Sequence, residues 1–410
     1  MSLYVRRWIK IALFNLFIVA SIGVVLRYKI AFSLPFIDQK HLLHGHSHFA
    51  FAGWISQAIM ILLVAYLATQ RGETIYKRYR WLLYANLFTA YGMLITFPVE
   101  GYGLYSIIFS TLSIFVTYFF AVYYWRDLNK LKIKSTVLYW FKAAVFFNAL
   151  SSLGAFALAA MMVAKIVHQN WYLAAEYFYL HFQYNGWFFF ACMGLLTAKL
   201  SAHADLFILK RIFLLFVTAV VPAYFLSALW MNIPTWVYVL VIVAAFAQVI
   251  AWVYTLGVIK NQLPVLKSSM PPIAKWLLIF SATALTIKLL LQLGSTIPSL
   301  SNLAFGFRPI VIGYLHLVLL GMITLFLLGY MLAYNVITIN KKTITGAIIF
   351  TSGIIINEIF LMTQGVAALT YTNIPFINEA LLAAALIMFT GLLLLLVSQN
   401  KKRKSDLNHK

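Results

Sequence analysis

Charged residues are scarce in this chain, and their scarcity limits the class of protein more than any motif does. Only 10% of the 410 residues are Asp, Glu, Lys or Arg, and nine are acidic, whereas 63% are hydrophobic. Soluble domains carry about 25% charged and about 45–50% apolar residues. A soluble fold of this composition would leave much apolar surface in water, so we exclude it, together with disordered and collagen-like chains.

Cysteine is nearly absent as well. The single Cys192 can form no internal disulfide, which excludes a disulfide-stapled scaffold and says nothing about the compartment. The net charge of +22 would suggest nucleic acid in a soluble protein. In so apolar a chain, basic loops that set membrane orientation and meet anionic lipid explain this charge better, and we expect no nucleic-acid partner.

Long apolar runs fill the chain and predict an all-α polytopic membrane protein. A spanning helix takes about 20 residues, so twelve transmembrane helices with short loops use most of the length, and we expect a single transmembrane domain over residues 1–410. The expected spans cover residues 8–26, 44–67, 79–97, 102–124, 136–166, 174–200, 209–230, 235–258, 275–293, 310–332, 343–363 and 377–397.

Lys and Arg lie mostly on one side of these spans. Twenty-four fall in alternate loops and at both termini, five fall on the opposite side, and Lys142 and Lys288 fall inside helices. The positive-inside rule therefore predicts that both termini are cytoplasmic. The first helix is followed directly by more chain of the same kind, so we interpret it as a span of a bacterial inner-membrane protein and not as a cleaved signal.

One short pattern occurs three times: a His, four further residues and then a Gly. It starts at His48, His181 and His316, at intervals of 133 and 135 residues, and opens the second, sixth and tenth spans. Each His is expected in the outer third of its span, so the three imidazoles share one depth, which favours a common metal or cofactor role. The spacing predicts three four-helix repeats, arranged as pseudo-symmetric arcs, over about residues 1–135, 136–270 and 271–410.

The Gly of each copy allows two interpretations. Gly53, Gly186 and Gly321 indicate either close packing between helices or space for a flat cofactor. Trp54 and Trp187, which follow two of these glycines, are more typical of packing than of cofactor contact.

The second span begins with a cluster of histidines. At about 100° per residue, His41, His44 and His48 share one face of the helix, and His46 points to the opposite side. His46 and His48 therefore offer imidazoles to two different sites, and neutral imidazole is a ligand of iron, copper and zinc. Axial histidines commonly hold a haem. For His41 and His44, a solvated start of the helix is the alternative.

The segment His46-Ser47-His48-Phe49-Ala50-Phe51-Ala52-Gly53 resembles the His-x-His helix of the haem–copper oxidase and nitric-oxide reductase superfamily. Small NnrS-like haem-binding membrane proteins are a closer match than the oxidases in length and in lacking extra domains. The resemblance implies twelve helices in three arcs and a bound haem b, with copper as a second cofactor. It does not extend to the complete three-histidine copper site of the oxidases, because residues 209–230 contain no His and position 185 is Asn185 where the oxidases have Tyr.

The resemblance and the repeats together lead to a ligand hypothesis. One haem b lies between His48 and His316, while His46 and His181 form a second site for a haem or a single metal ion. His44 is a further metal candidate. Pseudo-symmetry allows other pairings, so the assignment of partners stays open at this point.

Two classes of function fit these features. The first is a redox protein in which haem handles nitric oxide or oxygen, or passes electrons from an unidentified donor or partner subunit; whether it is an oxidoreductase stays open. The second is a transporter with histidines as proton or metal carriers, and a non-catalytic haem or metal carrier keeps the same ligands. Glu358 and Lys288 lie inside expected spans, where they either pair or serve a proton path.

Overall fold

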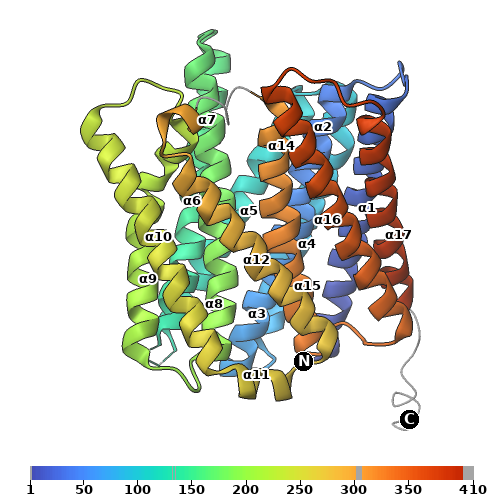
Figure 1. Cartoon of the computed structure of the whole chain (residues 1–410). Helices are drawn as coiled ribbons and strands as arrows, with labels where there is room; N and C mark the ends of the chain where they lie inside the picture. Colours follow the sequence, from blue (N-terminus) through green and yellow to red (C-terminus); the bar gives the residue numbers. More distant parts are fainter. Residues whose placement is uncertain (1, 132, 134, 302–306, 400–410) are drawn as a thin grey trace.

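The computed structural model describes residues 2–131, 133, 135–301 and 307–399, and within them it contains helices and no strand (Figure 1). The helices stand side by side in one bundle, and the C-terminal helix lies beside the N-terminal one. The elements are α1 (Leu3–Ala31), α2 (Gln39–Phe49), η1 (Ala50–Ser56), α3 (Gln57–Arg71), α4 (Ile75–Glu100), α5 (Leu104–Asn129), α6 (Thr136–Val163), α7 (Gln169–His181), η2 (Phe182–Phe188), α8 (Phe189–Leu200), α9 (Leu206–Val220), η3 (Pro222–Ala228), α10 (Thr235–Asn261), α11 (Leu263–Ser269), α12 (Pro272–Gly294), α14 (Arg308–His316), η4 (Leu317–Thr324), α15 (Leu325–Ala333), α16 (Lys341–Leu369) and α17 (Ile377–Ser398).

Ten helices of the described chain are long and apolar enough to cross a membrane, or eleven if one bent pair counts as a span. The bent pair is α9 with η3, which meet at 46° where Pro222 interrupts the helix. The run over residues 169–200 is helical but does not qualify, and its Tyr, Gln, Asn and His side chains make it more polar than its neighbours. The all-helical architecture expected from composition is therefore confirmed, with ten candidate membrane spans in the described chain where twelve spans were expected.

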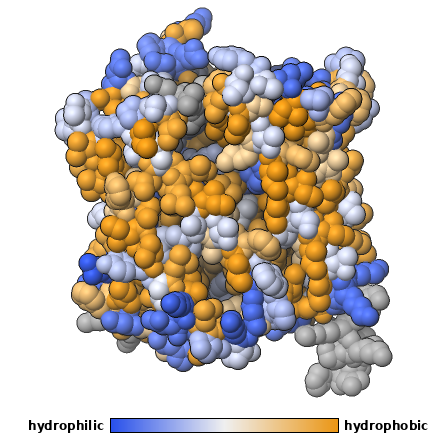
Figure 2. All heavy atoms as spheres, in the orientation of Figure 1, coloured by the Kyte–Doolittle hydropathy of each residue, from blue (hydrophilic) through white to orange (hydrophobic). Residues whose placement is uncertain are grey.

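The outer surface matches this architecture. Figure 2 shows a broad hydrophobic belt around the middle of the visible face, with hydrophilic residues gathered at both ends. The helix α5 is also largely on the outside of the bundle, because only 22% of its most apolar stretch is buried. Apolar surface of this extent fits contact with lipid chains.

The helix over Gln39–Arg71 lies in the interior of the bundle. In its most apolar stretch 83% is buried, more than in any other candidate span of the described chain. The other two helices that carry the His–Gly pattern, over residues 169–200 and 308–333, join it there through contacts between α3 and α8 and between η2 and η4. These three helices are called the interior helices below.

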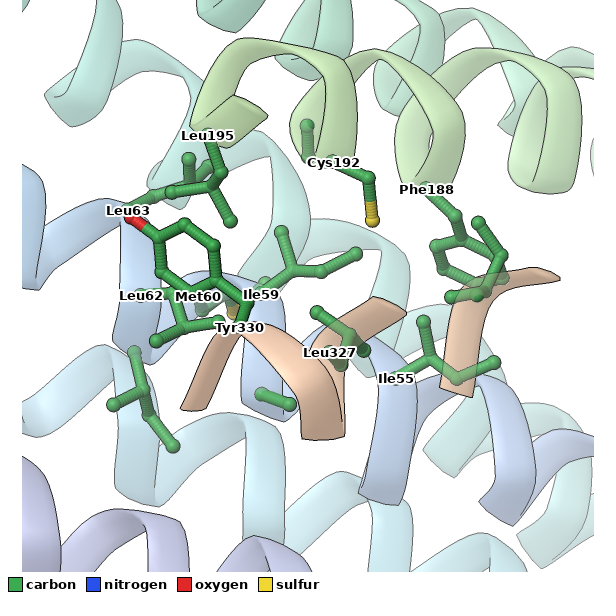
Figure 3. Close-up of a cluster of buried hydrophobic side chains, with 14 of the residues drawn as sticks. Ile55, Ile59, Met60, Leu62, Leu63, Phe188, Cys192, Leu195, Leu327 and Tyr330 are labelled. Atoms are coloured by element: carbon green, nitrogen blue, oxygen red, sulfur yellow. The ribbon is translucent and has the colours of Figure 1, made fainter. Parts of the chain in front are cut away.

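Matched positions of the three interior helices meet in the same core (Figure 3). Counting from the His of each copy, position 11 is Ile59, Cys192 or Leu327, and all three side chains belong to one buried cluster. Positions 7 and 14 behave in the same way. Position 7 is Ile55, Phe188 or Ile323, and position 14 is Leu62, Leu195 or Tyr330. The lone cysteine is therefore a packed core residue.

A buried carboxylate, Asp127, links two neighbouring helices at the end of the bundle where α1 begins. Asp127 is completely buried near the end of α5, where its oxygens lie 2.9 Å from Arg71 Nη1 and 3.3 Å from Arg78 Nε. The Tyr79 hydroxyl donates a hydrogen bond to it at 2.9 Å, and Lys130 Nζ lies 3.9 Å away. This cluster fastens the α3–α4 turn to α5.

Candidate functional site

A π-helical segment follows each His of the repeated pattern. Segment η1 begins two residues after His48, and segments η2 and η4 begin one residue after His181 and His316. π-helical turns are rare and occur frequently at functional sites. The three copies thus share a backbone conformation, which the pattern of residues did not predict.

The three repeated glycines lie inside these π segments and face protein. A Cβ at Gly53 would lie 2.6 Å from the Phe49 ring, and one at Gly186 would lie 2.5 Å from Phe147 Cβ. At Gly321 the nearest atom, 3.2 Å away, belongs to Ala284. Of the two interpretations of the glycines, these contacts favour close packing.

Carbonyl groups of the π segments receive hydrogen bonds from neighbouring helices. Asn15 Nδ2 donates to the Gly53 carbonyl at 2.6 Å, and Asn86 Nδ2 donates to the Ala52 carbonyl at 3.0 Å. In the third copy, Ser281 donates to the Met322 carbonyl at 2.7 Å. A change in helical repeat frees carbonyl groups, which are costly to leave unpaired in a membrane. Sequence reasoning missed these residues, although a lone Asn in an apolar span was a usable signal.

The interior helices are joined by two tryptophans at the same place in the pattern. Trp54 and Trp187 each stand six residues after a pattern His, and each indole N–H donates at 3.0 Å, to Thr324 and to Ser56 respectively. Both acceptors stand eight residues after a pattern His. These tryptophans therefore make specific hydrogen bonds in addition to packing.

His46 on α2 and His316 on α14 both lie on the side of the bundle near α1. A Cβ at Gly23 of α1 would lie 3.5 Å from His46 Cε1, and His46 is within electrostatic range of both His316 and Arg27. His316 Nδ1 donates its proton to the Ile312 carbonyl at 2.8 Å, which leaves the Nε2 lone pair free. The buried Nδ1 of His46 has no hydrogen-bond partner in the described chain. These two imidazoles are thus available as ligands.

His48 faces the opposite side, as the helical geometry predicts. Its ring stacks on Phe97 with centroids 4.3 Å apart and an interplanar angle of 7°. The His44 ring meets the edge of Tyr102 at 4.7 Å. A Cβ at Gly101 would lie 2.5 Å from His41 Nε2. The shared face of His41, His44 and His48 is therefore packed against the junction of α4 and α5.

His181 has a different environment from the other two pattern histidines. It is completely buried, and its Nε2 lies 2.8 Å from the Val220 carbonyl, to which it must donate. Its Nδ1 therefore accepts from Asn185 Nδ2 at 3.1 Å. Val220 ends α9 just before Pro222, where Tyr224 N–H bonds to Val221 instead of Val220. His181 thus satisfies the carbonyl that the bend releases, and neither of its ring nitrogens is left for a metal.

The expected ligands do not meet at one point. In the described part of the chain, no group of three or more His, Cys, Asp or Glu side chains lies close enough to hold a metal ion. Glu358 and Lys288 do not pair either, because the ion pairs between described side chains are those of Asp127. Glu358 accepts a hydrogen bond from Asn357 at 3.2 Å and lies within electrostatic range of Arg27. Sequence reasoning counted Arg27 only as a basic residue of the outer side.

Comparison with known proteins adds no family assignment. No protein-family model matches the chain, and no curated protein matches it in sequence.

Proposed function

We propose that this chain is a haem b-binding protein of the bacterial inner membrane, with twelve spans and both termini in the cytoplasm. The observation that carries the proposal is the pair formed by His46 and His316, two imidazoles from different interior helices that lie within electrostatic range of each other with nitrogens available. The excess of Lys and Arg on the side of the termini supports the orientation.

Three four-helix arcs are part of the same proposal. The repeated pattern, the π segment after each of its histidines and the core positions shared by the interior helices support an arrangement in which each arc contributes one interior helix. The polar run over residues 169–200 and the bent pair α9–η3 would then be the sixth and seventh spans. Polar residues are tolerated in the sixth span because its neighbours in the bundle satisfy them.

The residues fit a haem better on the His46 side than on the His48 side. The Nδ1–H of His316 is held by a backbone carbonyl, which is the arrangement that orients a ligating imidazole and leaves its Nε2 for the metal. Arg27, near both rings, would offset the negative charge of the haem carboxylates. His46 is therefore preferred over His48 as the partner of His316, and His48 with His44 would remain for a second group. Copper stays a prediction.

When bound, haem supplies electron transfer and, where a coordination position opens, binding of a diatomic gas such as nitric oxide or oxygen. The chain's own residues would hold it in place. The Ile312 carbonyl fixes the His316 ring, and the hydrogen bonds of Asn15 and Asn86 to η1 fix the helix that carries His46.

Four single variants test the assignment in the purified full-length protein: His46→Ala, His316→Ala, His48→Ala and His181→Ala. We expect a Soret band in the wild type, loss of at least half of the haem in the first two variants, and full haem in His181→Ala, which serves as the matched control. The pyridine haemochrome assay measures the haem content. Wild-type haem content in both His46→Ala and His316→Ala would contradict the proposal.

The pattern of loss also separates the two possible pairings. If His48→Ala loses the same haem as His316→Ala while His46→Ala keeps it, the partner of His316 is His48. Loss in all three would indicate two haems, one on each side of α2.

A transporter is the second candidate, and the bend between α9 and η3 is the observation that favours it. Broken helices in membranes commonly mark a transport pathway. A protein that has no Soret band after expression with ample haem, but moves a metal ion or protons across liposomes, would support this candidate.

A further inference from the structure

A small, partly open cavity lies where η2 and the start of α8 meet α9, α10 and α12. It has a volume of about 10 Å³, and its polar lining consists of Asn185, Gln248 and Lys288. These side chains are only 5%, 5% and 3% exposed. The rest of the wall is formed by apolar side chains, among them Phe189 and Phe216. We call this space the Lys288 chamber.

Asn185 presents an acceptor that has no partner. Its amide Nδ2 is committed to His181 Nδ1, because the Nε2–H of His181 is committed to the Val220 carbonyl. Its Oδ1 is buried and makes no hydrogen bond within the described residues. A buried carbonyl oxygen without a donor is unfavourable, so a donor is expected in the chamber.

Lys288 presents the complementary donor without a counter-charge. Its ammonium lies 6.0 Å from the Phe189 ring centre, and no carboxylate of the described chain is within ion-pair distance. Among the described residues, His181 on α7 interacts electrostatically with Lys288, and the lining residues on α9 and α10 carry no charge. An isolated ammonium in the membrane interior is costly and is retained mainly where it functions.

The size of the chamber selects its occupant. A cavity of about 10–15 Å³ holds one water molecule, provided that it has two or more polar partners, and larger solutes do not fit. One water between Lys288 Nζ and Asn185 Oδ1 would satisfy the donor and the acceptor at once. Gln248 supplies a third polar group.

We propose that the Lys288 chamber is an internal proton-binding site, in which a bound water links Lys288 to Asn185. The lone pair of the neutral amine forms a new N–H bond with a proton that arrives on the water as hydronium. The corresponding O–H bond breaks, and the water stays in place. On release the same bonds form and break in reverse. This site is independent of haem binding.

Thermal unfolding of the purified full-length protein over a range of pH tests the site. Charging an uncompensated amine in the folded protein is unfavourable, so the wild-type Tm is expected to fall from about pH 9 to about pH 6. Lys288→Met removes this dependence and is expected to raise the Tm at the lower pH by about 2 °C or more. Lys142→Met is the matched control, because Lys142 lies over the exposed Trp125 ring on another helix and should keep the wild-type slope.

Two variants of the acceptor Asn185 keep the proposal testable if Lys288→Met does not fold. Asn185→Asp gives the amine a counter-charge and should flatten the pH dependence, whereas Asn185→Leu removes the acceptor and should steepen it. A Tm that shifts equally at every pH in Lys288→Met would assign the lysine a purely structural role and overturn the proposal. Equal pH slopes in the two Asn185 variants would also overturn it.

Discussion

Trp54 donates its indole N–H to the Thr324 hydroxyl at 3.0 Å, across two interior helices that are 270 residues apart in sequence. Trp187, at the same position of the second copy, donates its indole N–H to the Ser56 hydroxyl of the first copy. The third pair at these positions is Met322 and Phe189, which are apolar and buried. Two of the three matched pairs of positions thus link interior helices through a hydrogen bond. The third pair, Met322 and Phe189, has side chains that form no such bond.

Removal of either partner of the Trp54–Thr324 bond should destabilise the bundle. We expect Trp54→Phe and Thr324→Val each to lower the free energy of unfolding by about 1–3 kcal/mol, because each leaves a buried polar group unpaired or creates a void. The double variant should lose less than the sum, with a coupling of about 1 kcal/mol. Denaturant unfolding in detergent measures these values. The control is Trp236, which is 67% exposed, and Trp236→Phe should have little effect. Strict additivity in the cycle would rule out the bond.

The π segments should not tolerate a side chain at their glycines. Gly53→Ala places a methyl group 2.6 Å from the Phe49 ring and should destabilise the protein by about 1–3 kcal/mol. Gly257 of α10 has no atom within 4 Å of a built Cβ, so Gly257→Ala should be neutral or stabilise by up to about 1 kcal/mol. Thermal unfolding compares the two variants, and equal Tm values would count against close packing at η1.

The hydrogen bonds of His181 predict a loss of stability without a loss of haem. His181→Phe keeps the bulk of the ring but leaves the Val220 carbonyl and the Asn185 amide unpaired. We expect this to lower the free energy of unfolding by about 1–3 kcal/mol. Hydrogen exchange should increase around the bend at Pro222, and the haem content should stay at the wild-type level. The exposed His203 supplies a control, since His203→Phe should change neither. A haem-free His181→Phe protein with unchanged stability would reverse this assignment.

The ion pairs of Asp127 should stabilise the folded protein. Asp127→Asn removes the charge that Arg71 and Arg78 share and should lower the free energy of unfolding by about 1–3 kcal/mol, at the low end because both Arg side chains are about one third exposed. Higher salt should narrow the difference between variant and wild type. Asp205→Asn, at an exposed helix start, is the control. A variant as stable as the wild type at low salt would show that the cluster is dispensable.

The start of α2 should fray in acid. The N–H groups of His41 and Lys40 donate to the exposed Asp38 carboxylate at 2.8 Å, and the bond from His41 is the main reason that the pKa of Asp38 is lowered. A lowered folded-state pKa means that the stabilisation is present above about pH 4 and is lost as the pH falls through the folded value. The protection of the first-turn amides of α2 against hydrogen exchange, relative to their intrinsic rates at each pH, should therefore fall below about pH 4. Asp38→Ala should show this low protection at every pH; protection as high as in the wild type would contradict the capping role.

Much of the fold could be predicted because it depends on local composition. Ten of the expected spans coincide with helices of the described chain that are long and apolar enough to cross a membrane, and the opposite directions of His46 and His48 follow from the helical repeat alone. The π segments could not be predicted, because the carbonyl groups they release are paired by Asn15, Asn86 and Ser281 from other helices. Pro222 indicated a bend after α9, but nothing in the sequence indicated that His181 would form a hydrogen bond with the Val220 carbonyl at this bend.

By itself, the sequence determined that this protein is a helical membrane bundle with three related histidine positions, since hydrophobic runs and spacing are properties of the chain read in order. Only the tertiary structure decided that these positions are not equivalent. His181 is committed to Val220 and Asn185, His48 stacks on Phe97, and His316 shares a side of the bundle with His46 and Arg27. The availability of a ring nitrogen depends on which distant group comes to lie beside it, and that is settled when the helices pack.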